Sequence, residues 1–269
     1  MTDAAAPPQA PQEPAQPKPP NNFVGLGLLA VWLALGALIF FQPSGIAVFG
    51  FVMAGWILAV MAHEFSHAAV AWLGGDHTVV AKGYLSFDPR RYGDLGVSLV
   101  IPVLALIMGG VGFPGGAVYL RNDLMRGPLW RAAASLAGPA ATFVVLLVLS
   151  FGLSVWASWG VSGAGPAALF EALTVLAFLQ AMALILNLLP IPGVDGFGVI
   201  RPFLPASLAP SIRKAEGLVM VALLFLIFVV PGASAALFRA AASLSGMMGL
   251  NLFALRDGWA AFHFWAGQR

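Results

Sequence analysis

The chain has 269 residues, of which 60% are hydrophobic and only 9% are charged, with a formal net charge of +2. Because soluble domains contain about 25% charged residues, this composition excludes an ordinary soluble domain and indicates a protein solvated mostly by lipid; no basic cluster with interleaved aromatic residues supports nucleic acid as a partner. The chain has no cysteine, which excludes disulfides, thiolate metal sites and a cysteine nucleophile, so a transition-metal site must use His, Asp or Glu.

Three parts are predicted along the chain. Residues 1–22 are rich in Pro, Ala and Gln, which is typical of a disordered tail and not of a signal peptide. Residues 23–231 form the predicted membrane-embedded domain, because they contain apolar runs long enough to cross a bilayer of about 30 Å. Residues 232–269 mix Trp and Phe with charged residues, which favours an interfacial helical segment, with a further span as the alternative. In chain order the expected spans are Phe23–Gln42, Ile46–Leu73, Ala132–Ser158, Ala167–Leu189 and Leu218–Val230, the last starting nearer Ser211.

The connection between the second and third spans is unusually long. Its polar part, Asp76–Asp94, contains two stretches, Thr78–Val80 and Tyr84–Phe87, that favour short strands. An apolar run, Leu95–Phe113, follows with Pro and Gly inside it, and Gly115–Leu120 again favours a strand. We therefore predict an all-α polytopic membrane protein with about five to six transmembrane helices and a re-entrant, partly strand-like segment in this connection.

The basic residues distinguish two paths for Leu95–Phe113. If the run crosses the membrane, the basic residues before and after it lie on opposite faces and the positive-inside signal is lost. If it dips in and returns, ten basic residues lie on one face, and the other face receives the uncharged turns Pro43–Gly45 and Trp159–Pro166. We expect the re-entrant path, which is tolerated where protein or a watery cavity surrounds the backbone, with the N-terminus on the cytoplasmic face of the cell (inner) membrane. The ten residues are Lys18, Lys82, Arg90, Arg91, Arg121, Arg126, Arg131, Arg201, Arg213 and Lys214.

The second span carries His63, Glu64 and His67 in the pattern H-E-x-x-H. Histidines four residues apart lie on one helix face, about one turn apart. This pattern is typical of zinc held by both imidazoles, with the glutamate acting on the attacking water. Ionisable side chains in a membrane helix are costly and indicate function. A catalytic zinc site normally needs a third protein ligand.

Asp195 is the strongest candidate for this third ligand. It follows a helix ended by Pro190 and Pro192, and irregular backbone at a helix end can place a carboxylate near membrane depth. On the re-entrant path, the spans that lead to His63 and to Asp195 both end at the cytoplasmic face, so the expected site lies towards the cytoplasm, whereas on the crossing path they end at opposite faces. Four other residues fit loop or interface positions better: His77, His263, Glu171 and Glu216.

Together these motifs resemble the site-2 protease family of intramembrane zinc metalloproteases. The resemblance rests on His63–His67, on the Gly138-Pro139 pair that opens a later span, and on Asn187–Gly196, which follows the pattern N-x-x-P-x-x-x-x-D-G. It covers residues 46–201 and suggests a compact member, without a PDZ or regulatory domain. Family members often carry an asparagine shortly after the proline, whereas this chain has Ala140–Thr142 there.

The resemblance implies a site and a reaction. One zinc ion would be held by His63, His67 and Asp195, with Glu64 as the catalytic base and Asn187 close to the reacting carbonyl. The implied activity is hydrolysis of a peptide bond within or beside a transmembrane segment of a membrane-protein substrate, by zinc-activated water. The lipid bilayer and a transmembrane protein substrate are the implied partners.

Two other functions use the same residues. The first is a catalytically inactive, metal-binding membrane scaffold with the same fold. The second is a transporter, which more often shows inverted repeats and paired broken helices; the sequence shows no clear internal repeat.

Overall fold

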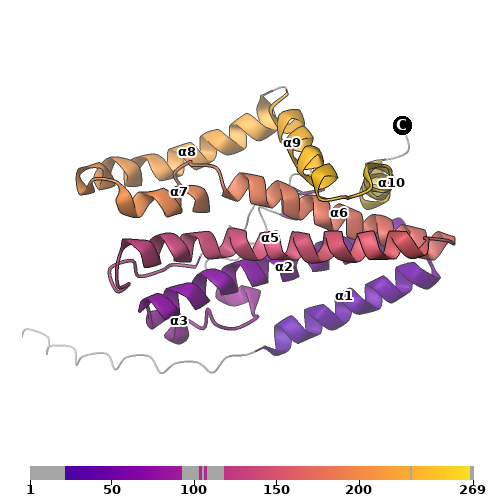
Figure 1. The fold of residues 1–269 in the computed structure, drawn as a ribbon, viewed down its shortest axis with the longest axis horizontal. Coiled ribbons are helices and arrows are strands. Elements are labelled where there is room, and N and C mark those ends of the chain that lie inside the picture. Colours follow the sequence, from indigo (N-terminus) through magenta and orange to yellow (C-terminus); the bar gives the residue numbers. More distant parts are fainter. Residues whose placement is uncertain (1–21, 93–102, 105, 108–117, 231, 267–269) are drawn as a thin grey trace, which may run out of the picture.

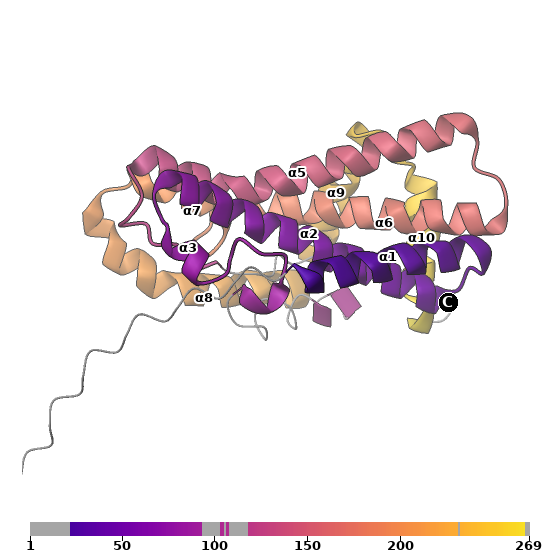
Figure 2. The same ribbon diagram turned by 90° about the horizontal axis from the view of Figure 1, so that it is seen from below.

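The structure is a computed structural model that describes residues 22–92, 103–104, 106–107, 118–230 and 232–266. Within these residues every regular element is a helix, and the four helices that are long and apolar enough to cross a membrane lie side by side (Figures 1 and 2). The helices are α1 (Phe23–Phe41), α2 (Gly45–Gly74), α3 (Thr78–Ala81), η1 (Pro89–Arg91), α5 (Pro128–Trp159), α6 (Ala164–Asn187), α7 (Asp195–Ile200), η3 (Arg201–Phe203), η4 (Ala206–Leu208), α8 (Ala209–Val229), α9 (Ala233–Met247), α10 (Leu252–Phe262) and η5 (Phe264–Ala266).

The helices confirm the predicted all-α polytopic fold. In the described part of the chain, α1, α2, α5 and α6 are long and apolar enough to cross a membrane. Helices α8 and α9 meet at 88° and make a fifth span if they are one broken crossing. The described part of the chain therefore has four spans, or five with the broken crossing, compared with the five to six expected. Helix α6 lies innermost. In an apolar stretch of 18 residues, 78% of the residues of α6 are buried, compared with 17% of those of α1.

Helix α2 owes its limits to residues at its ends. The Ser44 hydroxyl accepts a hydrogen bond from the Ala47 N–H at 3.3 Å, which satisfies a free donor of the first turn. Gly75 adopts a left-handed conformation (φ 117°) and donates its N–H to carbonyls of the last turn, as glycine commonly does after a helix. The 30 residues between these ends carry both histidines of the H-E-x-x-H motif on one continuous helix.

The prediction of strands in the long connection between α2 and α5 is wrong at the residues that the structure describes. Thr78–Val80 lies in helix α3, because the Asp76 carboxylate accepts hydrogen bonds from the Thr78 N–H and hydroxyl, and this turn starts a helix. Tyr84–Phe87 forms turns and bends, in which the Ser86 hydroxyl donates to the Gly83 carbonyl at 2.6 Å. Local hydrogen bonds therefore outweigh the strand preference of the β-branched and aromatic residues.

Most of the expected re-entrant run, Leu95–Phe113, and the beginning of Gly115–Leu120 lie outside the described residues. Leu106 is described, and it is fully buried in a cluster with side chains of α2 and α6. Both ends of the connection lie at one end of the bundle, because the Arg126 N–H donates to the Gly74 carbonyl at 2.9 Å. A re-entrant path requires this arrangement of the ends of α2 and α5.

Candidate metal centre

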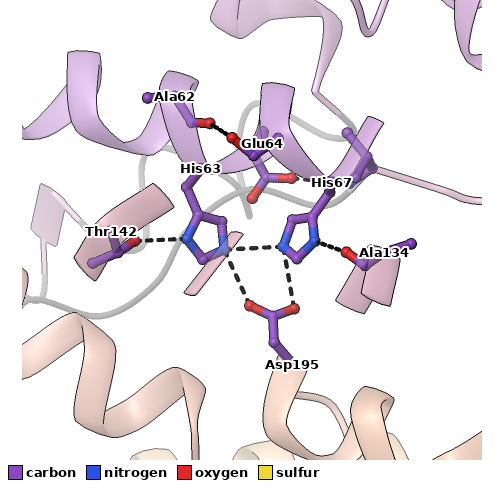
Figure 3. A network of polar contacts seen from close by, with 9 residues as sticks. Ala62, His63, Glu64, His67, Ala134, Thr142 and Asp195 are labelled. Atoms are coloured by element: carbon purple, nitrogen blue, oxygen red, sulfur yellow. Dashed lines mark hydrogen bonds and ion pairs between the residues drawn. The ribbon is translucent and has the colours of Figure 1, made fainter. Parts of the chain in front are cut away.

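The two histidines of α2 point their Nε2 atoms toward each other. They lie one helical turn apart, both are buried, and their Nε2 atoms are 3.0 Å apart (Figure 3). Two imidazole nitrogens this close, on one face of a helix, form two corners of a possible metal site.

Asp195 completes a group of three donors. After α6 ends at Asn187, the chain turns and begins α7 at Asp195. Its Oδ2 atom lies 3.1 Å from His63 Nε2, and its Oδ1 atom lies 3.3 Å from His67 Nε2. Within the described residues, these three side chains are the group of His, Asp or Glu that could hold a metal ion, with their donor atoms within 4.8 Å of one another.

This donor set fits zinc. Two imidazoles and a carboxylate are ligands that zinc accepts, and three protein ligands leave a position open for water or substrate. Both Nδ1 atoms have protein partners, as described next, so that both Nε2 atoms remain available to an ion.

Helix α5 orients the two imidazoles. His67 Nδ1 donates to the Ala134 carbonyl at 2.7 Å, which leaves the Nε2 lone pair directed at the centre. His63 Nδ1 lies 2.8 Å from the Thr142 hydroxyl oxygen. Contacts of this kind set the tautomer and the ring direction of metal-binding histidines.

Gly138 allows α5 to pack closely against the two histidines of α2. A Cβ atom on Gly138 would lie 2.2 Å from His67 Nε2 and 2.4 Å from His63 Nε2, well inside contact distance. Pro139 follows within the helix. Packing therefore requires the glycine of the Gly-Pro pair at this position, because the side chain of any larger residue would occupy the space in front of the imidazole nitrogens.

Glu64 lies beside the three donors and is not one of them. Its side chain is 3% exposed, and its Oε2 atom accepts a hydrogen bond from the Val118 N–H at 3.2 Å. The backbone just before α5 therefore holds one carboxylate oxygen of Glu64. Asn187, the last residue of α6, is also buried and lines a small cavity together with His63. The structure thus brings all five predicted site residues into one region.

The alternative ligands lie elsewhere. His77 is exposed before α3, and His263 packs edge-on or tilted among aromatic rings near Trp259. Glu216 forms an ion pair with Arg201 at 2.8 Å. None of these belongs to the group of three donors, and neither does Glu171.

Sequence reasoning missed the residues that support the centre. Thr142, the Ala134 carbonyl and the Val118 N–H were not singled out as contacts of the site. One signal was available: Ala134, Gly138 and Thr142 are spaced four residues apart, so that they share one face of a helix whose middle residue belongs to the Gly-Pro motif.

Comparison with known proteins identifies relatives over most of the chain. The chain is 42% identical over 209 residues to "Putative zinc metalloprotease Rip2" of Mycolicibacterium smegmatis, covering 74% of this chain and 78% of that protein. It is 36% identical over 256 residues to the protein of the same name from Mycobacterium tuberculosis strain H37Rv, covering 93% and 95%. It is 24% identical over 177 residues to "Putative zinc metalloprotease YwhC" of Bacillus subtilis, covering 65% and 78%. No family model and no solved structure matches the chain.

Proposed function

Because the chain belongs to the site-2 protease family of zinc metalloproteases, we propose that it hydrolyses a peptide bond within or beside a transmembrane segment of a membrane-protein substrate. The observation that carries this proposal is the convergence of three donors beside Glu64: His63 and His67, on a helix long enough to cross a membrane, and Asp195 at the start of α7. The lipid bilayer and a transmembrane protein substrate are the partners that this reaction requires.

The metal would be bound by residues of two helices, α2 and α7. His63 Nε2, His67 Nε2 and an oxygen of Asp195 would hold one zinc ion, and Thr142 and Ala134 would keep the two rings in position. When bound, zinc supplies Lewis-acid chemistry, which lowers the pKa of water toward about 7 and polarises a carbonyl oxygen.

Glu64 moves the proton in the proposed reaction. Its carboxylate takes a proton from the attacking water and returns it to the leaving amine nitrogen. The Val118 N–H holds Oε2, which leaves Oε1 to receive the proton. Asn187, which lines the cavity beside His63, would donate its side-chain N–H to the oxygen of the reacting carbonyl as negative charge develops there.

The substitution Glu64→Gln tests this function. The purified, zinc-loaded variant should retain zinc, because Glu64 is not a ligand, and should lose cleavage of a membrane substrate by at least about 10²-fold, the contribution of a general base. Glu171→Gln is the matched control, a carboxylate of a spanning helix outside the donor group, and should cleave as wild type does. Cleavage that survives in Glu64→Gln would show that the mechanism is wrong.

The same variant identifies the substrate. Glu64→Gln in native membranes should retain uncleaved membrane proteins, which mass spectrometry of the purified complexes identifies by comparison with wild type. Wild-type protein that binds zinc and cleaves none of the retained proteins would instead support the inactive, metal-binding scaffold.

A further inference from the structure

A small cavity lies next to the metal centre, between α2, α5 and α6. The lining residues of α2 are spaced mostly three or four positions apart, and so are those of α6. One face of each helix therefore borders the cavity. His63 and Asn187 form its side toward the metal centre. The lining residues are Trp56, Ala59, Val60, His63, Thr142, Gln180, Ala183 and Asn187.

Two of the residues that line this cavity have a buried side-chain donor without a partner in the described part of the chain. The side-chain Nε2 of Gln180 and the indole Nε1 of Trp56 accept and donate no hydrogen bond within the described residues. Gln180 is only 2% exposed and Trp56 only 1%. A buried polar group without a partner costs about 1–3 kcal/mol, so two such groups beside one cavity require an explanation.

The size and chemistry of the cavity suit water. Its volume for the centre of a water molecule is about 20 Å³, above the roughly 10–15 Å³ that one water needs. Two N–H donors require an acceptor, which neither a cation nor an apolar molecule provides. A water molecule can accept two hydrogen bonds and donate two, so it suits N–H donors together with the oxygens of Thr142 and Asn187, which also line the cavity.

We propose that this cavity is a water-binding site, in which Gln180 and Trp56 hold water beside His63 for use in hydrolysis. The water site itself stands on the two unpartnered donors and the volume; its use in hydrolysis rests on the proposed function. Hydrolysis inside a bundle that faces lipid consumes water, and this site stores it within the protein, next to a metal-binding side chain.

Thermal unfolding of the purified full-length protein tests the water site without any cleavage assay. Gln180→Met keeps the side-chain length and removes the donor. If water bridges the two donors, Gln180→Met lowers the unfolding midpoint by about 2–4 °C, and combining it with Trp56→Phe costs less than the sum of the single changes, because either change alone breaks the shared bridge. If the cavity is dry, Gln180→Met removes an unpaired polar group, raises the midpoint and adds to Trp56→Phe, and the proposal is wrong.

Thr174→Val is the matched control. Thr174 is a buried polar residue of the same helix that does not line the cavity, and its hydroxyl donates within the helix to the Phe170 carbonyl at 2.8 Å. Its effect should add to that of Trp56→Phe. If Gln180→Met does not fold, a high-resolution experimental structure of the wild type decides: density for water within hydrogen-bond distance of Gln180 supports the site, and an empty cavity overturns it.

Cleavage kinetics test the use of this water. In zinc-loaded Gln180→Met, kcat should fall about tenfold, the upper effect of one lost hydrogen bond, while KM and zinc affinity stay as in wild type. A lowered midpoint with unchanged kcat would show that the water is structural and does not supply the reaction. Since the unfolding experiment needs no activity, it gives its answer even if Glu64→Gln shows that the chain is no protease.

Discussion

Among single residues, those of α5 shape the metal centre although α5 supplies none of the three donors. Ala134 and Thr142 hold the Nδ1 atoms, and Gly138 leaves room for the Nε2 atoms. The sequence predicted His63 and His67 because the H-E-x-x-H pattern is local to one helix. That pattern alone does not predict the contact of Thr142, because the contact depends on how α5 packs against α2, 79 residues away in the chain; the spacing of Thr142 from Gly138 indicates only a shared helix face.

Removing the Thr142 hydroxyl should weaken zinc binding. Thr142→Val keeps the shape of the side chain but leaves His63 Nδ1 without its partner, and such changes typically weaken metal affinity by about 10–100-fold. Thr142→Ser retains the hydroxyl and should bind zinc nearly as wild type does. Competition with a chelator of known affinity measures the effect, and equal affinity of the Val and Ser variants would contradict the orienting role.

Gly138→Ala should displace the imidazoles. The added Cβ would lie 2.2 Å from His67 Nε2, and since α5 cannot approach as closely, the purified variant should contain far less than one zinc per chain. Gly152→Ala, in the same helix, meets no atom within 4 Å and should stabilise the helix by about 0.5–1 kcal/mol. Metal analysis and thermal unfolding of the pair give the comparison; a zinc content of Gly138→Ala equal to that of Gly152→Ala would exclude the steric role.

At the level of elements, the apolar runs of the sequence predicted the spanning helices to within a few residues. The start of the third span differs from its prediction: α5 begins at Pro128 and not at Ala132, because proline is favoured in the first turn of a helix. The strand prediction at Thr78–Val80 failed for a different reason. Asp76 is fully buried, and its bonds to Thr78 fix a helical turn that propensity alone does not reveal.

Asp76 also ties the connection before α5 to the end of α2. Its second carboxylate oxygen accepts the Arg121 N–H at 2.7 Å. Asp76→Asn would turn an N–H₂ group toward one of these donors, so we expect a loss of about 1–3 kcal/mol in the free energy of unfolding and faster hydrogen exchange at residues 118–121.

Asp123→Asn is the control for Asp76→Asn. Asp123 pairs with Arg121 on the surface, where both side chains are more than half exposed, and exposed ion pairs contribute little. Its substitution should change the free energy of unfolding by no more than about 0.5 kcal/mol. Equal effects of the two substitutions would show that the buried contacts of Asp76 do not stabilise the connection.

For the whole molecule, two contacts fix which helix ends lie together. The Arg126 N–H bonds to the Gly74 carbonyl where α2 ends and α5 begins. At the other end of the bundle, a Cβ on Gly165 would lie 1.8 Å from the Phe40 carbonyl oxygen, so that the start of α6 touches the end of α1. In this arrangement Asp195 lies beside His63, and the turns after α1 and α5 lie at the opposite end of the bundle from α7 (Figure 2).

Cysteine labelling can determine which end faces the cytoplasm, because the chain has no cysteine of its own. By the positive-inside rule we expect Gln42→Cys and Ser162→Cys to react with a membrane-impermeant maleimide added outside intact cells. Asn122→Cys and Ser207→Cys should react only after the membrane is opened. All four positions are exposed, so a lack of reaction reports the membrane barrier and not burial.

If the connection before α5 crosses the membrane instead, Asn122→Cys would react together with Gln42→Cys, and Ser162→Cys would be protected. That result would separate Asp195 from the face of His63 and would contradict both the orientation and the shared metal site.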